Sequence, residues 1–207
     1  DRIYRINSIG LGPNGEHFSE SSTTSLPLKQ ELEEHFTGVE RAVRLMRGFG
    51  NIWLELEMAQ NVNIPVSGYF ADPEVLDIFE YELEHGDPKT ALIEPFSVVL
   101  TKRTAKKLFR EENPLGQTFM VGVEGPYKVT GILKETGHKS HIAFDAFASM
   151  STIKSLAAQT KNNKAFDTGN PYDGFESWYD YNSGWVYLLL QEGQTIESLM
   201  PQLRKVE

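Results

Sequence analysis

Between Ser97 and Leu133 the spacing of the apolar residues changes twice, and these changes restrict the fold more than any other feature of the chain. The stretch begins with a short continuous apolar run to Leu100, which is typical of a buried strand. Thr101 is a favourable helix N-cap, and apolar residues then recur at helical spacing as far as Phe109. A strand followed directly by an amphipathic helix predicts a mixed α+β domain.

The residues after this helix predict a tight turn and then a β-hairpin. Residues 113–116 read Asn-Pro-Leu-Gly and end the helix, because proline restricts the residue before it and glycine accommodates the turn. Apolar residues alternate with other residues from Phe119 and again from Tyr127, on either side of a Glu-Gly-Pro turn. This pattern predicts two antiparallel strands joined at that turn.

Regular spacing of apolar residues predicts further elements on both sides of this block. Helices are expected at residues 25–36, 73–79, 150–160 and 195–203, and strands at residues 2–9, 64–70 and 185–190. Alternation on both sides of a glycine-containing turn predicts a second hairpin from residues 39–46 and 52–58. Residues 9–24 and 161–177 are rich in glycine and small polar residues, and they are expected to form loops.

Charge and composition argue against several classes of function. The chain has 207 residues, of which 40% are hydrophobic and 24% are charged, as in an ordinary soluble globular protein. Its net charge of −9 argues against a nucleic-acid partner and against docking on anionic lipid through a basic surface. Cysteine is absent, which removes disulfides, thiol nucleophiles and cysteine-based zinc sites.

The sequence contains no transmembrane pattern of its own. No run approaches the roughly 18 consecutive apolar residues that a membrane-spanning helix needs. The chain starts at Asp1 without an initiator methionine or a signal peptide, as expected of a piece excised or processed from a longer protein.

His138, His141 and Asp145 have the spacing of a metal site, because residues at these intervals share one face of a helix. The surrounding residues 134–140 read as a loop, however, and no second cluster of ligands is evident in the sequence. The interpretation that we favour is that Ser140, His141 and Asp145 organise, through hydrogen bonds, the connection back to the outer subdomain of a discontinuous fold. The sequence therefore predicts no metal site.

A catalytic site is not expected either. Ser140 or Ser149, with His141 and Asp145, would supply the residue types of a hydrolase triad, but no Gly-x-Ser-x-Gly turn presents such a nucleophile. The sequence also lacks the glycine-rich motifs that bind the phosphates of ATP or of dinucleotides. The acidic runs at residues 31–34 and 80–84 fit the solvated faces of amphipathic elements. The sequence thus predicts a protein that is not an enzyme.

Aromatic residues crowd a segment rich in Gly, Asn and Asp, from Phe166 to Trp185. Tyrosine and tryptophan among polar neighbours are common in surfaces that contact carbohydrates or proteins. The residues expected to make such a partner contact are Tyr172, Trp178, Tyr179 and Tyr181. In the alternative interpretation, the segment folds back and packs its aromatic rings onto the sheet.

Five short phrases of the sequence resemble, in the same order, the large extracytoplasmic domain of MacB-type, FtsX-like ABC transporter permeases. They are Val-Leu-Thr-Lys with Ala-x-x-Leu-Phe in Val99–Phe109, Asn-Pro-Leu-Gly-x-x-Phe in Asn113–Phe119, Tyr-x-Val-x-Gly-Ile-Leu in Tyr127–Leu133, Ser-His-Ile-x-Phe-Asp in Ser140–Asp145, and a closing strand with its glycine turn in Trp185–Gly193. The resemblance extends from about Pro65 onward, and it is closest to the long, duplicated permeases common in Bacteroidetes.

The resemblance implies a discontinuous α+β fold. Residues 1–75 and 141–207 would form a Porter-like subdomain of strand–helix–strand units, and residues 76–140 would form a mixed, Sabre-like subdomain inserted into it. It also implies a place on the extracytoplasmic (periplasmic) face of the bacterial inner membrane, where transmembrane helices absent from this chain would tether the domain.

The function implied by the resemblance is mechanotransmission rather than catalysis. The domain would couple ATP-driven motion of transmembrane helices to substrate export or partner contact outside the membrane. It would hold no cofactor, because ATP would be bound by a separate cytoplasmic ATPase subunit. Its expected partners are the permease's own transmembrane helices, the second permease domain, indirectly the ATPase, and a periplasmic adaptor or client protein. The alternative is an extracytoplasmic sensor module that binds carbohydrate or peptide through the aromatic segment.

Overall fold

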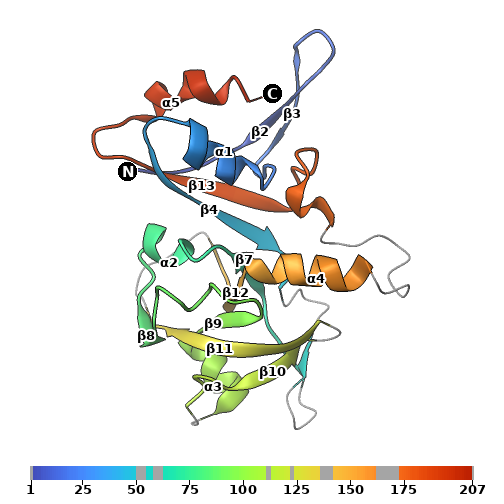
Figure 1. Ribbon diagram of the computed structural model, residues 1–207, viewed down its shortest axis with the longest axis vertical. Coiled ribbons are helices and arrows are strands. Elements are labelled where there is room, and N and C mark those ends of the chain that lie inside the picture. Colours follow the sequence, from blue (N-terminus) through green and yellow to red (C-terminus); the bar gives the residue numbers. More distant parts are fainter. Residues whose placement is uncertain are drawn as a thin grey trace. The chain divides into compact units, whose positions relative to one another are not determined.

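The computed structural model describes residues 2–49, 55–57, 63–110, 113–121, 124–135, 142–161 and 173–206 (Figure 1). The structure is mixed α+β, which confirms the predicted fold class. It divides into two compact units: unit 1 comprises Asp1–Arg44 and Asp173–Glu207, and unit 2 comprises Leu45–Tyr172. None of the described helices is long and apolar enough to cross a membrane.

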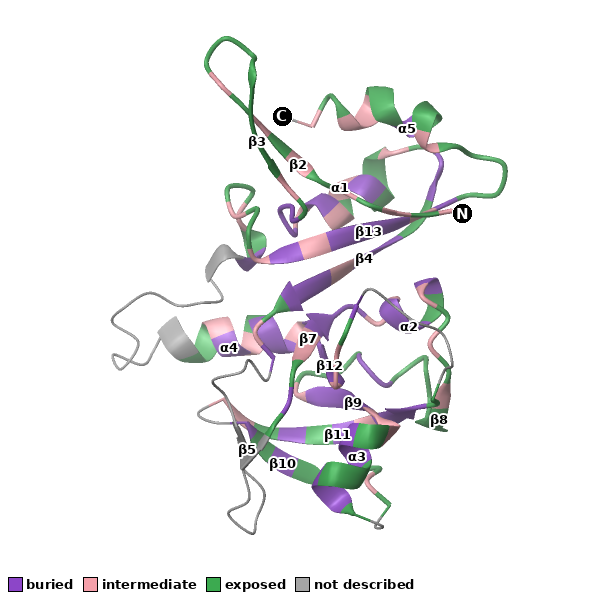
Figure 2. Cartoon of the chain, turned by 180° about the vertical axis from the view of Figure 1, so that it is seen from behind, coloured by how far each residue is buried: buried purple, intermediate pink, exposed green. Residues whose placement is uncertain are grey.

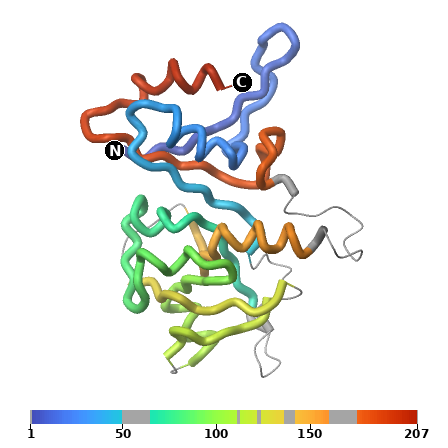
Figure 3. The backbone as a smooth tube through the Cα atoms, in the orientation of Figure 1, coloured from blue at the N-terminus to red at the C-terminus, as the bar shows by residue number. Residues whose placement is uncertain are grey.

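The two ends of the chain build unit 1, and its middle builds unit 2, as the colours along the tube in Figure 3 show. The bounds of these units differ from those expected for the Porter-like and Sabre-like subdomains. The assignment of residues 76–140 to an inserted subdomain therefore stays a prediction.

Unit 1 contains three neighbouring strands, in which β13 (Gly184–Leu190) lies between β1 (Ile3–Arg5) and β4 (Val39–Arg47). β1 runs antiparallel to β13. β2 (Ser8–Leu11) and β3 (His17–Ser21) form a separate antiparallel hairpin. The helices are α1 (Leu28–His35), α5 (Ile196–Leu203) and the short 3-10 helix η2 (Asp173–Glu176).

The core of unit 1 lies where α1 and α5 pack against this sheet. Leu28 and Leu32 are four residues apart in α1, so they share one face of the helix, and both are buried. The cluster also contains Val39, Ala42, Val186, Leu188, Leu190 and Leu199. Tyr4 and Leu203 pack against the same cluster, which means that the first strand and the last helix share one core.

The last three residues of β4, from Leu45, belong to unit 2. From there the strands follow the order β4-β7-β12-β9-β11-β10-β5-β6, and β8 pairs with β11 beside this path. Their bounds are β5 (Glu55–Glu57), β6 (Asn63–Pro65), β7 (Gly68–Ala71), β8 (Leu83–Gly86), β9 (Ser97–Thr101), β10 (Thr118–Val121), β11 (Gly125–Leu133) and β12 (Ala146–Ser149). β12 is parallel to β7 and antiparallel to β9, whereas β9 is parallel to β11. The helices are α2 (Val75–Ile78), α3 (Lys102–Phe109) and α4 (Ser151–Lys161).

The segment from β9 to β11 confirms the strand, helix and hairpin predicted from the sequence. The Thr101 hydroxyl accepts a hydrogen bond of 3.2 Å from the Thr104 N–H, so this residue caps α3. β10 and β11 form the expected antiparallel hairpin, with Phe119 opposite Tyr127. The Tyr127 ring is fully buried and lies 5.1 Å from the ring of Phe49 and 5.3 Å from that of Phe96.

Two predictions made from the sequence are wrong. Residues 9–24 were expected to form a loop, but they contain most of the β2–β3 hairpin. A second hairpin was expected from residues 39–46 and 52–58, but β4 lies beside β13 and β7, and β5 lies between β10 and β6. The alternation of side chains defines which face of a strand is buried, but it does not define which strand lies beside it.

Candidate functional site

The β2–β3 hairpin of unit 1 is largely exposed to solvent (Figure 2). Several of its exposed residues are large and apolar. Ile9 and Leu11 are two residues apart in β2, so they point to the same side of the strand, and both are exposed. The side chain of Phe18 in β3 is 81% exposed. Within the described part of the chain, no third strand pairs with this hairpin. An isolated two-stranded hairpin is marginally stable alone, which favours its use as a contact element.

The local sequence explains why the chain reverses direction here. Gly15 has a φ of 79°, a left-handed conformation that glycine adopts without steric cost. The Gly12 N–H donates to the Glu16 carbonyl at 2.8 Å, and the Asn14 N–H donates to the Glu16 carboxylate at 3.0 Å. Glu16 and Glu20 make the hairpin acidic, since residues 8–21 contain no Lys or Arg.

The predicted contact residues Trp178, Tyr179 and Tyr181 are exposed between η2 and β13, and the Tyr179 side chain is 92% exposed. Asp180 shapes this turn, because its carboxylate accepts hydrogen bonds from the Asn182 N–H and the Ser183 hydroxyl. Another aromatic residue of the segment does fold back: Phe175 is buried, with the Arg44 guanidinium 4.9 Å from its ring centre. The two interpretations of the segment therefore apply to different residues. Phe166 and Tyr172 lie outside the described residues.

Within unit 1, the hairpin and the aromatic segment both adjoin the start of β13. The Thr24 N–H, just after the hairpin, donates to the Gly184 carbonyl at 3.0 Å, and the Ser8 hydroxyl donates to the Thr24 hydroxyl at 3.0 Å. Gly184 directly follows the aromatic segment. We call the exposed residues of both segments the contact face; they are Ile9, Leu11, Phe18, Trp178, Tyr179 and Tyr181.

The chemistry of the contact face suits protein recognition. Aromatic side chains dominate the binding energy of many protein interfaces, because they bury a large area at a low cost in conformational entropy. Glu16, Glu20 and Asp180 lie in the same two segments and are all acidic. A partner with an apolar patch bordered by basic residues would complement this face.

Asp145 of unit 2 is one of the residues considered above for a metal or hydrolase site. Its carboxylate accepts hydrogen bonds from the Ser67 N–H at 3.1 Å, from Arg103 at 2.9 Å and from the Thr104 hydroxyl at 3.3 Å. Its main chain adds two more bonds, from the Asp145 N–H to the Ser67 carbonyl and from the Thr101 N–H to the Asp145 carbonyl. Asp145 thus joins the segment before β7, the start of β12 and the first turn of α3.

These bonds give the Asp145 carboxylate a structural role in unit 2. That the connection leads back to an outer subdomain stays a prediction. Ser140, His138 and His141 lie outside the described residues. Ser149 is buried, and its hydroxyl is hydrogen-bonded to that of Ser151. Across the described residues, no group of three His, Cys, Asp or Glu side chains is arranged to hold a metal ion.

Comparison with known proteins connects this fold to a family of periplasmic domains. The family model of the MacB-like periplasmic core domain matches residues 1–206. Among solved structures, a domain of a candidate permease protein from Porphyromonas gingivalis is similar to this chain, with a TM-score of 0.76 and 21% identity over 99% of this chain and 79% of that chain. None of the curated proteins matches.

Two further structures share the fold at lower identity. The periplasmic region of MacB from Actinobacillus actinomycetemcomitans has a TM-score of 0.62 and 14% identity, over 99% of this chain and 84% of that chain. The extracellular domain of the noncanonic ABC-type transporter YknZ from Gram-positive bacteria has a TM-score of 0.61 and 13% identity, over 95% of this chain and 88% of that chain.

Proposed function

We propose, because this chain belongs to the family of MacB-like periplasmic core domains, that it is a mechanical element of an ABC transporter permease. In this proposal, transmembrane helices outside the chain tether it at the periplasmic face of the inner membrane. A separate cytoplasmic ATPase subunit binds ATP, and the helices carry the resulting motion to this domain. The domain passes that motion to a second permease domain and to a periplasmic adaptor or client protein, and it makes or breaks no covalent bond.

The packing of unit 1 supports the transmission of force. β1 and α5 are distant in sequence, yet residues of both pack against one buried cluster. Protein interiors are close-packed and have low compressibility, so a displacement applied at either element moves the whole packed unit. If the core of the unit were loosely packed, its side chains would rearrange and absorb the displacement instead.

The exposed contact face is the observation that carries the second half of the proposal, contact with a partner outside the membrane. Phe18 and Tyr179 are among the most exposed large side chains in the described structure, and both belong to segments with acidic neighbours. Large apolar side chains that are exposed in neighbouring segments are candidates for an interaction site. A periplasmic protein with a basic rim around an apolar patch is the partner that this face fits.

In-cell photocrosslinking from the contact face tests this proposal. A photoreactive phenylalanine at position 18 or 179 of the full-length permease is expected to give crosslinks to a periplasmic protein. The double variant Leu11→Ser/Trp178→Ser should weaken partner binding about 30-fold and lower the crosslink yield accordingly, since removing one interface hot spot costs about 2 kcal/mol or more in binding. The double variant should leave the free energy of unfolding unchanged to within about 0.5 kcal/mol, because both side chains are exposed.

The matched control position is Met120, an exposed apolar residue of unit 2 that lies outside the contact face. Equal crosslink yields from positions 18, 179 and 120 would contradict a specific contact face. The sensor alternative gives a different result: the tryptophan fluorescence would change saturably with glycans or peptides, and the change would disappear in Trp178→Ala.

A further inference from the structure

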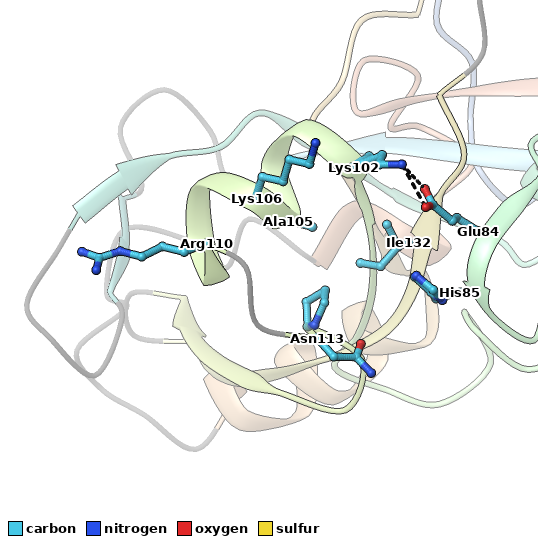
Figure 4. A pocket seen from close by; sticks show the side chains of 9 residues that line it. Glu84, His85, Lys102, Ala105, Lys106, Arg110, Asn113 and Ile132 are labelled. Atoms are coloured by element: carbon cyan, nitrogen blue, oxygen red, sulfur yellow. Dashed lines mark hydrogen bonds and ion pairs between the residues drawn. The ribbon is translucent and has the colours of Figure 1, made fainter.

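Unit 2 contains a groove of about 890 Å³ lined by residues of α3, β8 and β11 and by Asn113 and Pro114 (Figure 4). Its lining residues are Glu84, His85, Lys102, Ala105, Lys106, Arg110, Asn113, Pro114 and Ile132. A volume of this size is in the range of sites that hold small molecules in proteins, roughly 300–1,000 Å³. The groove uses no residue of the contact face.

The apolar part of the lining provides a surface for a hydrocarbon body. Ala105 of α3 and Ile132 of β11 are buried, so they form the floor of the groove, and Pro114 adds a third apolar side chain. Burial of apolar area stabilises a bound ligand in proportion to the area covered, before the costs of association. A purely ionic ligand would not gain from this floor.

Most of the charged side chains on the groove's rim are basic. Lys102 and Lys106 are four residues apart in α3 and therefore lie on the same face of the helix. The Lys102 ammonium is 2.8 Å from one carboxylate oxygen of Glu84 and 2.9 Å from the other. This hydrogen bonding lowers the pKa of Glu84 and raises the pKa of Lys102, so both groups are charged at neutral pH and largely offset each other.

Lys106 is the cation that remains for a ligand. Among the described residues, no hydrogen bond or ion pair joins its ammonium to another side chain, and its charge adds a smaller effect to the lowered pKa of Glu84. Glu84 is the acidic residue of the described lining. Figure 4 shows that the Arg110 side chain points away from Glu84 and His85, so Lys106 is the better placed of the two cations. An exposed lysine beside a buried apolar floor can bind an anionic group at the mouth of the groove.

A neighbouring hollow of about 480 Å³ offers a useful contrast. Its lining contains Glu84 and Glu135 but also Lys102 and Lys134, so the charges balance. Lys134 is further paired with Glu82 at 2.7 Å. An anion would therefore gain little binding energy in this hollow. The more favourable place for an anion is the groove on the Lys106 side of the Glu84–Lys102 pair.

We propose that this groove binds a small amphiphilic anion, which is an alkyl or ring body that carries one carboxylate or phosphate group. Lys106 binds the anionic group, and Ala105, Ile132 and Pro114 contact the apolar body. The basic rim selects against cations, and the apolar floor selects against ions without a hydrocarbon part. On a chain with a net charge of −9, such a site depends on local rather than overall charge.

Calorimetric titration of the 207-residue chain with four probes tests the proposal. Hexyl phosphate, hexanoate, inorganic phosphate and hexyl glucoside separate the contributions of charge and hydrocarbon. Saturable binding is expected for hexyl phosphate or hexanoate, and the tighter of the two identifies a phosphate or a carboxylate as the natural anionic group. Hexyl glucoside should bind up to about fivefold more weakly, since it lacks the charge and a surface ion pair contributes up to about 1 kcal/mol. Inorganic phosphate should also bind more weakly, because it has no hydrocarbon body to cover the apolar floor.

Three variants make the result specific to the groove. Lys106→Ala should weaken binding of the anionic probe about fivefold, whereas Lys128→Ala, which removes an exposed lysine elsewhere in unit 2, should not change it. Glu84→Gln should strengthen binding, because it releases Lys102 from its partner. Absence of saturable binding by both anionic probes, equal binding of hexyl glucoside, or an equal loss in Lys128→Ala would overturn the proposal.

Discussion

Replacing Gly86 with alanine is expected to destabilise unit 2 by about 3 kcal/mol or more. Gly86 ends β8 opposite Gly131 of β11, and its φ of 101° is a conformation that residues with a side chain rarely adopt. A Cβ atom at this position would lie 2.4 Å from the Thr130 carbonyl oxygen and 2.9 Å from the Gly131 Cα atom. Both contacts are with backbone, so relief of the clash requires β8 to move away from β11.

Gly116→Ala is the matched control for this prediction. Gly116 also has a positive φ, of 83°, but a Cβ atom there would meet nothing within 4 Å. The control isolates the cost of the backbone conformation, about 1–2 kcal/mol, from the cost of the clash. Urea unfolding of both variants measures the difference. If the two variants were destabilised equally, the close approach of β8 and β11 would not be the reason that position 86 requires glycine.

Replacing Asp145 with alanine is expected to lower the free energy of unfolding by about 2–3 kcal/mol. The substitution removes the acceptor of three hydrogen bonds, from Ser67, Arg103 and Thr104. The Asp145 side chain is only 16% exposed, so water cannot fully replace these bonds. The loss should appear in urea unfolding, together with faster hydrogen exchange at the Ser67 amide.

The Arg103→Ala variant separates the network from its exposed ion pair. The Arg103 side chain is 70% exposed, and a solvent-screened surface pair contributes at most about 1 kcal/mol. This variant leaves the bonds from Ser67 and Thr104 in place. If Arg103→Ala and Asp145→Ala reduced the stability equally, the connection would depend on the ion pair and the proposed network would be wrong.

The segment from β9 to β11 was predictable because the signals that define it are local. Thr101 caps α3, and the buried residues Leu108 and Phe109 of this helix follow within eight positions of the cap. The hairpin that follows is closed by the turn at Gly125, and its strands are neighbours along the chain. Each of these interactions forms between residues close together in sequence, so periodicity and turn residues are enough to indicate them.

The pairing of distant strands could not be predicted in the same way. β7 is parallel to β12, although Phe70 and its partner Ala148 are far apart in sequence. The alternation of apolar residues in β4 was recognised, but its partner β7 was not, because periodicity indicates a buried face and not a neighbour. The same limit hid the groove, whose residues come from α3, β8 and β11.

The contact face was half predicted. Trp178 and Tyr179 were identified because aromatic residues stand out in a polar segment, and the structure exposes both. The hairpin with Ile9 and Phe18 was predicted to be a loop, because residues 9–24 are rich in glycine and small polar residues. The residues of β3 are almost all exposed, so no buried stripe marks the strand. The turn sequence Pro-Asn-Gly at residues 13–15, flanked by these apolar residues, was the signal that could have indicated it.

The most direct test of mechanotransmission is the ATP dependence of distances between spin labels in the assembled transporter. Because this chain contains no cysteine, Met200→Cys in unit 1 and Met120→Cys in unit 2 each introduce a single labelling site in the domain. Both methionines are exposed, so the label should not disturb the core. With other cysteines of the full-length permease replaced, each label reports the distance between the two permease domains of the complex.

We expect the distance distribution of at least one label to shift when ATP binds to the cytoplasmic ATPase, and to return after hydrolysis. The shift should disappear in a variant of the ATPase that cannot bind ATP. Identical distributions with and without ATP at both labels, in a complex that hydrolyses ATP, would contradict the account that this domain carries motion across the periplasmic face.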